Sequence, residues 1–369
     1  MKIIISISII ILLITFFVII VVRLINKENS NDLIAQPTQS FLPTPSKEQL
    51  AVKGSIPYWD QDNAFESFQK NVQAFNYINL FWYFLTNNGE IKKYDYAIED
   101  QNLIAIAHAN NVKVMAVITN LPEIEGSTWD SKRVENVIKN STTRKKHILD
   151  ITDKLESLNF DGVNIDYESL DSSQKDNFTF FIKELTSILH EKNKIVSVSL
   201  HPKREGMKKN EDIGAFQDWI ALATVTDQLN IMAYGEHWDE GNAGPIASYN
   251  WVKNIIEYTQ KLNLPPEKLF LGIPLYGYDW NKDNDDKAKG LTFIDVENLR
   301  KNYDTKEKWD NNFRSPYFFY DDGDTHEVWF ENARSINEKI QLAKQAGFKG
   351  ITFWRLGGED SAVWENWQF

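Results

Sequence analysis

Apolar runs of strand length alternate with amphipathic runs of helical length along most of this chain. The strand candidates are rich in β-branched and aromatic residues, which favour extended structure. In the stretches between these strand candidates, apolar residues recur at helical spacing, for example at 174–191 and 249–262. Strands that alternate with helices in this way predict an α/β protein with a parallel sheet. The expected strands span residues 55–59, 77–85, 112–119, 162–168, 195–201, 228–234, 269–276 and 350–354.

Eight such strands predict a (β/α)8 TIM barrel, and residues 51–369 exceed the ~250 residues typical of that fold. Most of the excess lies between the last two strands, where 315–320 and 326–330 flank an Asp-Asp-Gly-Asp turn as in a β-hairpin. We therefore expect a small α+β insertion over about residues 279–332. A doubly wound open sheet is the alternative, but the first strand lacks the glycine-rich turn that such folds use.

The amino-terminal segment has a different pattern from the rest. Residues 3–22 form an almost unbroken apolar run, which matches the ~20 residues that cross a bilayer. A cleavable signal peptide has a shorter apolar region and a small-residue cleavage site. We therefore expect residues 1–28 to be a transmembrane helix, with a long signal peptide and a secreted product as the alternative. Residues 29–50 are polar and rich in proline, and are expected to link this anchor to a folded domain at 51–369 outside the cell.

Composition narrows the classes of function. The formal net charge is -12, so the chain lacks the basic surface that a nucleic-acid partner requires. It has no cysteine, which excludes disulfides and thiolate metal sites. Its six histidines are scattered without metal-binding spacing, so we expect neither a metal nor another cofactor. Aromatic residues make up 13% of the chain, which suits a large core, a carbohydrate site or both.

The fourth predicted strand carries the strongest chemical signal. Residues 160–168 read FDGVNIDYE, and strand alternation puts Asn164, Asp166 and Glu168 on one face. The apolar residues between them suit packing against helices, which leaves the polar face directed into the barrel. Catalytic groups of TIM barrels lie at the carboxyl ends of strands, and buried carboxylates are costly unless they have a function. The alternative is a solvated edge strand whose acidic side chains point outward.

This strand resembles the D-G-x-D-x-D-x-E signature of glycoside hydrolase family 18, the chitinase family. Met232-Ala233-Tyr234 on the sixth predicted strand is similar to the family's Met-x-Tyr, and Trp354 to its floor tryptophan. The insertion before the last strand is similar to the family's rim subdomain.

Three positions depart from the usual family pattern. Asn164 stands where most members have an Asp, and Gly235 stands where the family usually has an acid, with Glu236 next to it. The third strand ends in Thr119-Asn120 instead of the family's Ser-x-Gly-Gly. The two asparagines resemble the branch that contains spore-cortex and other peptidoglycan N-acetylglucosaminidases. The resemblance therefore favours bacterial wall glycan, while chitin remains open.

The resemblance implies a retaining glycosidase in which the substrate's own acetamido group is the nucleophile. It implies that Glu168 is the general acid and base, that Asp166 and Tyr234 hold the acetamido group, and that Trp354 lies beneath the sugar. Each of the two aromatic residues can instead be ordinary barrel core. Further substrate-binding candidates are Asn164, Tyr58, Trp82, Met232, Glu236 and Tyr276.

We therefore expect a monomeric, membrane-anchored glycosidase whose partner is a polysaccharide with β-1,4-linked N-acetylglucosamine. Two other classes remain open. One is a catalytically inactive glycan-binding protein on the same barrel, against which the presence of Glu168 argues. The other is an unrelated barrel enzyme such as a metal-dependent deacetylase, against which the scattered histidines argue.

Overall fold

Eight parallel strands form a closed barrel. The computed structural model describes residues 49–123, 128–284 and 286–365. Each strand pairs with the next along the chain, and β1 pairs with both β2 and β14, which closes the sheet. The predicted TIM barrel is therefore confirmed. Its strands are β1 (Ala51–Pro57), β2 (Tyr77–Leu85), β4 (Lys113–Thr119), β5 (Gly162–Asp166), β6 (Ile195–Leu200), β7 (Gln228–Ile231), β8 (Leu269–Pro274) and β14 (Gly350–Trp354).

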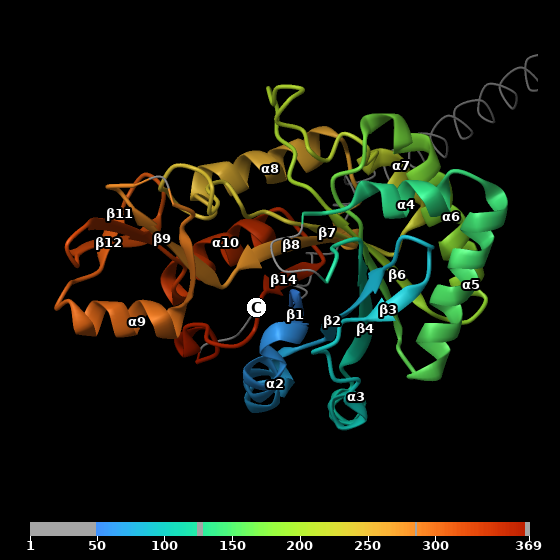
Figure 1. Cartoon of the computed structure of the whole chain (residues 1–369), viewed down its shortest axis with the longest axis horizontal. Helices are drawn as coiled ribbons and strands as arrows, with labels where there is room; N and C mark the ends of the chain where they lie inside the picture. Colours follow the sequence, from blue (N-terminus) through green and yellow to red (C-terminus); the bar gives the residue numbers. More distant parts are fainter. Residues whose placement is uncertain (1–48, 124–127, 285, 366–369) are drawn as a thin grey trace, which may run out of the picture. The chain divides into compact units, whose positions relative to one another are not determined.

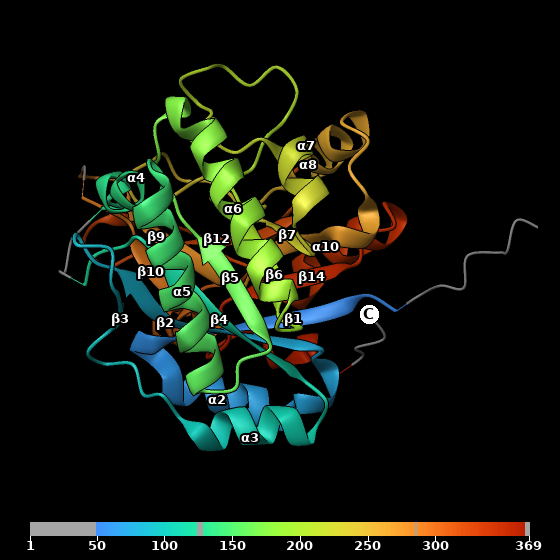
Figure 2. The same cartoon turned by 90° about the vertical axis from the view of Figure 1, so that its right-hand side faces the viewer.

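Helices cover the outside of this barrel (Figures 1 and 2). Most of them begin at an Asp, Asn or Ser side chain that accepts a backbone N–H of the first turn. The helices are α2 (Gln61–Lys70), α3 (Gln101–Ala109), α4 (Ser131–Ile138), α5 (Ser141–Ser157), α6 (Lys175–His190), α7 (Trp219–Val225), α8 (Tyr249–Lys261) and α10 (Ala333–Gln345). A short strand, β3 (Ile91–Lys93), adds antiparallel to β2.

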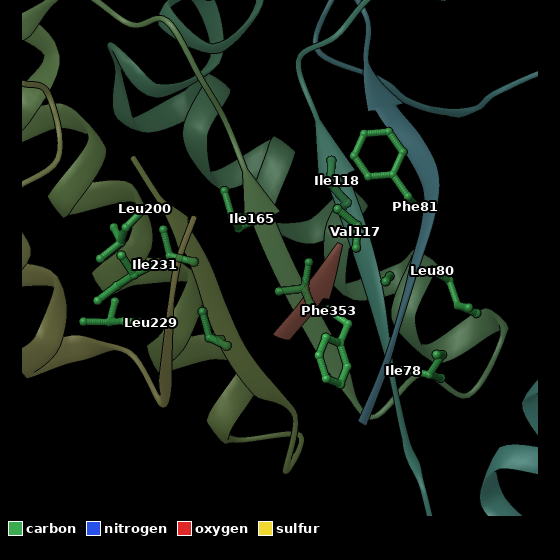
Figure 3. Close-up of a cluster of buried hydrophobic side chains, with 14 of the residues drawn as sticks. Ile78, Leu80, Phe81, Val117, Ile118, Ile165, Leu200, Leu229, Ile231 and Phe353 are labelled. Carbon is green, nitrogen blue, oxygen red and sulfur yellow. The ribbon is translucent and has the colours of Figure 1, made fainter. Parts of the chain in front are cut away.

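A single large core joins the strands to the helices around them. Figure 3 shows part of it, with apolar side chains that come from neighbouring strands. Ile118 on β4, Ile165 on β5 and Leu200 on β6 have no exposed surface. Because a close-packed interior resists displacement, the strand ends that follow these residues are held on a rigid frame.

Several strands end earlier than the hydrophobic pattern predicts. The sequence suggests that β5 continues to residue 168 and β7 to residue 234, whereas they end at Asp166 and Ile231. After β7 the backbone N–H groups of Ala233 and Tyr234 bond locally to Ile231 and Met232 instead of to a neighbouring strand. The residues that matter most for chemistry therefore lie just beyond the regular sheet.

A second, antiparallel sheet lies between β8 and β14, drawn in orange in Figure 1. It begins at Tyr276, earlier than the expected boundary at Asp279, because β9 follows β8 almost directly. The hairpin expected around residues 321–324 is formed by β12 and β13. The elements are β9 (Tyr276–Asn281), β10 (Lys289–Thr292), α9 (Phe293–Asn302), β11 (Lys308–Asp310), β12 (Ser315–Asp321) and β13 (Thr325–Trp329).

The expected membrane segment, residues 1–28, and nearly all of the expected linker lie outside the described residues. Within the described part of the chain, the structure contains no helix with the length and apolar character needed to cross a bilayer. Gln49 and Leu50 belong to the folded unit, which covers residues 49–369, and Leu50 is buried.

Candidate active site

A cavity of about 190 Å³ opens at the carboxyl ends of the barrel strands. Its lining comes from segments far apart in the sequence, which the closed barrel brings together. Polar lining residues rise from the barrel interior, and aromatic residues form the wall. The lining includes Trp59, Asn79, Phe81, Trp129, Asn164, Asp166, Glu168, Ser199, Asn230, Met232, Tyr234 and Trp354.

The polar face of β5 points into this cavity. Asn164, Asp166 and Glu168 all line it, as strand alternation requires of residues two apart. The opposite face packs outward, where the Tyr167 hydroxyl lies 2.7 Å from Nε2 of His147 on α5. The Tyr167 ring also stacks on Phe181 of α6. The solvated edge strand that the sequence left open is therefore excluded, because β5 lies inside a closed barrel between β4 and β6.

Glu168 is held just past the end of β5 by the neighbouring strand. The Asn120 amide, directly after β4, accepts the Glu168 N–H at 2.9 Å and donates to the Glu168 carbonyl at 2.9 Å. These two bonds replace the ladder bonds that an extended strand would make. The Glu168 side chain remains 14% exposed. The backbone of Glu168 is thus fixed, while its carboxyl group is open to the cavity.

Burial sets the protonation of the two carboxyl groups. Loss of hydration raises the pKa of Asp166 to about 6, an effect partly offset by the Ser199 hydroxyl. Burial and then the nearby Asp166 charge hold the pKa of Glu168 well above its usual range. A raised carboxyl pKa is the condition for a general acid that keeps its proton near neutral pH. One Asp166 oxygen, Oδ1, is buried with no hydrogen-bond partner among the described residues.

Tyr234 and Trp354 both line the cavity. Tyr234 lines the cavity, and burial followed by the Asp166 charge keeps its pKa well above the usual value, so it remains a neutral hydrogen-bond donor. Gly272 makes room for it, because a Cβ there would lie 3.0 Å from Cε1 of Tyr234 and 2.6 Å from the Ile231 carbonyl oxygen. Trp354 contacts Phe81 and Trp59 edge-on, and these three rings form an aromatic wall.

Some expected substrate contacts lie elsewhere. Trp82 is a wrong prediction, because its side chain has no exposed surface and packs against Tyr83 and Phe160. Tyr58 is outside the cavity lining and stacks on Tyr94 with ring centroids 4.0 Å apart.

Glu236 and Tyr276 are also outside the lining. The Glu236 carboxylate accepts the backbone N–H of Ser248 at the start of α8. The Tyr276 ring lies edge-on to the Tyr234 ring. Asn164 and Met232, in contrast, line the cavity.

Sequence reasoning missed several residues that the fold brings to the site. Trp129 lines the cavity from the segment after β4, and Asn120 holds the Glu168 backbone. His201, at the end of β6, has Nε2 3.4 Å from Oε2 of Glu168. Asn120 directly follows a predicted strand and His201 ends one, which was the available signal, because barrel sites are built from such positions. Trp129 lies farther along the connecting segment and had no such signal. In the described ranges, no cluster of three or more His, Asp or Glu side chains is arranged to hold a metal ion.

Comparison with known proteins adds independent evidence. The family model described as "Glycosyl hydrolases family 18" matches residues 55–359. The chain is 28% identical over 301 residues to a cortical fragment-lytic enzyme of Bacillus anthracis, covering 79% of this chain and 68% of that protein. Among solved structures it is similar to a chitinase from Chromobacterium violaceum, with a TM-score of 0.77, 25% identity and coverage of 85% and 96%. It is also similar to the Bacillus cereus spore cortex-lytic enzyme SleL, with a TM-score of 0.76, 25% identity and coverage of 85% and 73%.

These similarities confirm the resemblance indicated by the β5 motif, including its relation to the spore-cortex branch. The matched region contains all of β5 and extends beyond Trp354, so it includes the cavity described above. With Asp166 and Glu168 of the family motif at the mouth of a complete barrel, the chain belongs to glycosyl hydrolase family 18 and is a glycosidase.

Proposed function

We propose that this glycosidase hydrolyses β-1,4-linked N-acetylglucosamine glycans with retention of configuration, using the substrate's acetamido group as the nucleophile. The observation that carries the proposal is the position of its acidic groups. The carboxylates that line the described cavity, Asp166 and Glu168, stand two residues apart at and just beyond the end of β5. A retaining enzyme with its own nucleophile needs a second carboxylate ~5–5.5 Å away, across the scissile bond. In the part of the chain that the structure describes, no such carboxylate lines the facing wall, so a retaining reaction here would take its nucleophile from the substrate.

Glu168 has the properties of the acid and base in this reaction. Its raised pKa favours the protonated carboxyl, which can give a proton to the leaving glycosidic oxygen. The carboxylate that remains then removes a proton from the incoming water. The same carboxyl oxygens take part in both steps, so the water has to reach the Glu168 side chain. The partial exposure of that side chain at the cavity mouth suits this entry.

Asp166 and Tyr234 suit the two ends of an acetamido group. The unpartnered Asp166 Oδ1 can accept the acetamido N–H, and an ionised Asp166 stabilises the positive charge that develops on the cyclic intermediate. The neutral Tyr234 hydroxyl can donate to the acetamido oxygen, which directs that oxygen at the anomeric carbon. Trp354 offers a flat apolar surface beneath the pyranose ring, with Met232 beside it in the lining.

We favour bacterial wall glycan as the substrate and the cell surface as the place of action. The similarity to proteins named cortical fragment-lytic and spore cortex-lytic enzymes supports the first. The apolar run at residues 3–22 and the proline-rich segment after it support the second. Protease treatment of intact, wall-stripped cells tests the location, because full protection of the domain until lysis would contradict it.

The reaction is tested by incubating the purified full chain with peptidoglycan and with chitin oligomers, and identifying products by mass and by proton NMR. We expect β-anomeric products at early times, competitive inhibition by a thiazoline analogue of the cyclic intermediate, and no cleavage of a fully deacetylated glycan. A covalent glycosyl-enzyme trapped by a fluorosugar would overturn the proposal. Binding of both polymers without products would show that the barrel binds glycans but does not cleave them.

A further inference from the structure

Two strands that flank β5 converge on Glu168 from opposite sides. From β4, Asn120 holds the Glu168 backbone through its amide. From the end of β6, the imidazole of His201 faces the Glu168 side chain, with 3.4 Å between Nε2 and Oε2. The Asn120 contact fixes the backbone of Glu168. The His201 contact is with the carboxyl group that would exchange protons.

His201 is held in place by the surrounding fold, and its Nε2 makes no other hydrogen bond among the described residues. Its side chain is 3% exposed, and Nε2 has no hydrogen-bond partner among the described residues. The His201 backbone N–H donates to Oε1 of Gln217 at 2.9 Å, and Gln217 in turn donates to the Ser199 carbonyl. The edge of the imidazole packs against Phe216. An orphaned buried nitrogen is uncommon and costly, and here it points at a reacting carboxyl group.

We propose that His201 is a positioning residue for this reaction, a neutral imidazole whose Nε2 hydrogen is donated to the Glu168 carboxylate. The inference rests on the proposed role of Glu168. The 3.4 Å separation is long for a hydrogen bond, as such contacts often are in catalytic sites without substrate, where they shorten in the complex. The bond is strongest when Glu168 is ionised, which is the state reached after protonation of the leaving group.

The groups around the pair keep the imidazole neutral. Burial, with a smaller effect from the Lys203 charge, lowers the pKa of His201 to about 4. Glu168 faces Asp166 on β5 and Tyr234 after β7, in addition to His201. Lys203 is engaged elsewhere, with the Asp212 carboxylate at 3.5 Å and the Gln217 carbonyl at 2.9 Å. At neutral pH the imidazole therefore acts on Glu168 as a hydrogen-bond donor and not as a cation.

The direction of the effect follows from these charges. A hydrogen bond to the ionised form of a carboxyl group lowers its pKa. His201 thus opposes the upward shift that burial and Asp166 impose on Glu168. It keeps Glu168 able to lose its proton to the leaving group and then to act as a base on water.

The test compares pH profiles of kcat/KM for the full chain and its variants on one β-1,4-linked N-acetylglucosamine oligomer. His201→Phe keeps an aromatic ring against Phe216 and removes the donor, so we expect the alkaline limb to move upward by about one pH unit. We also expect kcat to fall about tenfold or more, with little change in KM. His201→Gln retains a neutral N–H donor and is expected to restore most of both. If Phe disturbs the packing, the smaller His201→Leu carries the same expectation.

The matched control is His190→Phe, since His190 is a partly exposed histidine at the end of α6, away from the cavity. Its profile should superimpose on that of the unchanged chain. A His201→Phe profile that also superimposes would overturn the inference, and so would a downward shift, which would mean that the imidazole accepts a proton from Glu168 instead. Glu168→Gln separates this failure from that of the proposed function. If Glu168→Gln remains fully active the function itself is wrong, whereas an inactive Glu168→Gln with unaffected His201 variants removes only the inference.

Discussion

The barrel interior contains two polar regions that differ in how their polar groups are hydrogen-bonded. The floor network consists of Lys53, Asn164, Ser197, Gln228 and Asn230, and its polar groups bond to one another. The mouth cluster consists of Asp166, Glu168, His201 and Tyr234, and it contains buried polar atoms that have no hydrogen-bond partner within the described ranges. Both regions are largely buried, so burial alone does not separate structural from functional polar groups. These two regions differ in how far their polar atoms are hydrogen-bonded.

In the floor network, each named group is satisfied by its neighbours. The fully buried Lys53 donates to Gln228 at 2.7 Å and to Asn230 at 2.8 Å, and its Nζ lies 4.3 Å from the centre of the Phe270 ring. Asn230 in turn donates to Asn164 at 2.6 Å and to Ser197 at 2.8 Å. Burial lowers the pKa of Lys53 well below its usual value. A closed network of this kind stabilises one arrangement of the strands and leaves little capacity for a ligand.

In the mouth cluster, the atoms that find no partner in the described part of the chain are Oδ1 of Asp166 and Nε2 of His201. Unsatisfied buried groups cost stability, and native proteins retain them mainly where function repays that cost. The comparison therefore predicts that changes at the floor lower stability, whereas changes at the mouth lower activity.

The largest expected effect is at the mouth. Glu168→Gln keeps the shape of the side chain and removes the ionisable group, so turnover should fall by ~10²–10⁴ while oligomer binding survives. Because burial raises the pKa of Glu168, this carboxyl favours the folded state below its ordinary value of 4.5, and that contribution is lost as pH rises through the folded-state value. At neutral pH the variant should thus unfold no earlier than the unchanged chain. Steady-state kinetics and thermal unfolding measure the two effects, and unchanged turnover would remove Glu168 from the mechanism.

The next effect is at the floor. Asn230→Leu takes an acceptor from Lys53 and a donor from Asn164, and we expect the free energy of unfolding to fall by about 3 kcal/mol, as for other orphaned buried groups. Urea unfolding of both chains measures it. Asn136→Ala, at an exposed position on α4, is the control and should change stability by less than ~0.5 kcal/mol. Equal stability of the Asn230 variant would mean that the floor network is not structural.

The smallest effect is at the boundary between the two regions, where Asn164 belongs to the floor network and also lines the cavity. Asn164→Asp can keep the Asn230 bond and places a second carboxylate ~7 Å from Asp166 and ~14 Å from Glu168 along the strand. Two unit charges at ~7 Å repel by ~2.4 kcal/mol with an effective dielectric near 20, and by about half that at ~14 Å. The added charge should therefore raise the pKa of Glu168 by at most about one unit and move the alkaline limb of kcat/KM upward. A limb that superimposes on the original would show that Asn164 is not electrostatically coupled to Glu168.

The sequence by itself determined the barrel and the face of β5 that carries the chemistry. Alternation with a period of two is a local property, so the positions of Asn164, Asp166 and Glu168 relative to one another follow from the strand alone. The order of strands and helices likewise constrains the topology, and the acidic motif indicates the family. Trp82 shows the limit of this reasoning, since it lies on the face of β2 opposite Asn79 and Phe81, and only the assembled sheet reveals which face is inside.

Only the tertiary structure decided which other residues meet Glu168 and which polar groups are left without partners. Asn120 and His201 are separated from it by 48 and 33 positions, and they reach it because β4 and β6 pair with β5 in a fixed register. The raised carboxyl pKa values likewise come first from burial within the assembled barrel, and the Asp166 charge, two residues away, adds to the shift at Glu168. Local patterns specify what each strand presents on its two faces. The closure of the barrel specifies what those faces meet, because that depends on pairing between strands far apart in the chain.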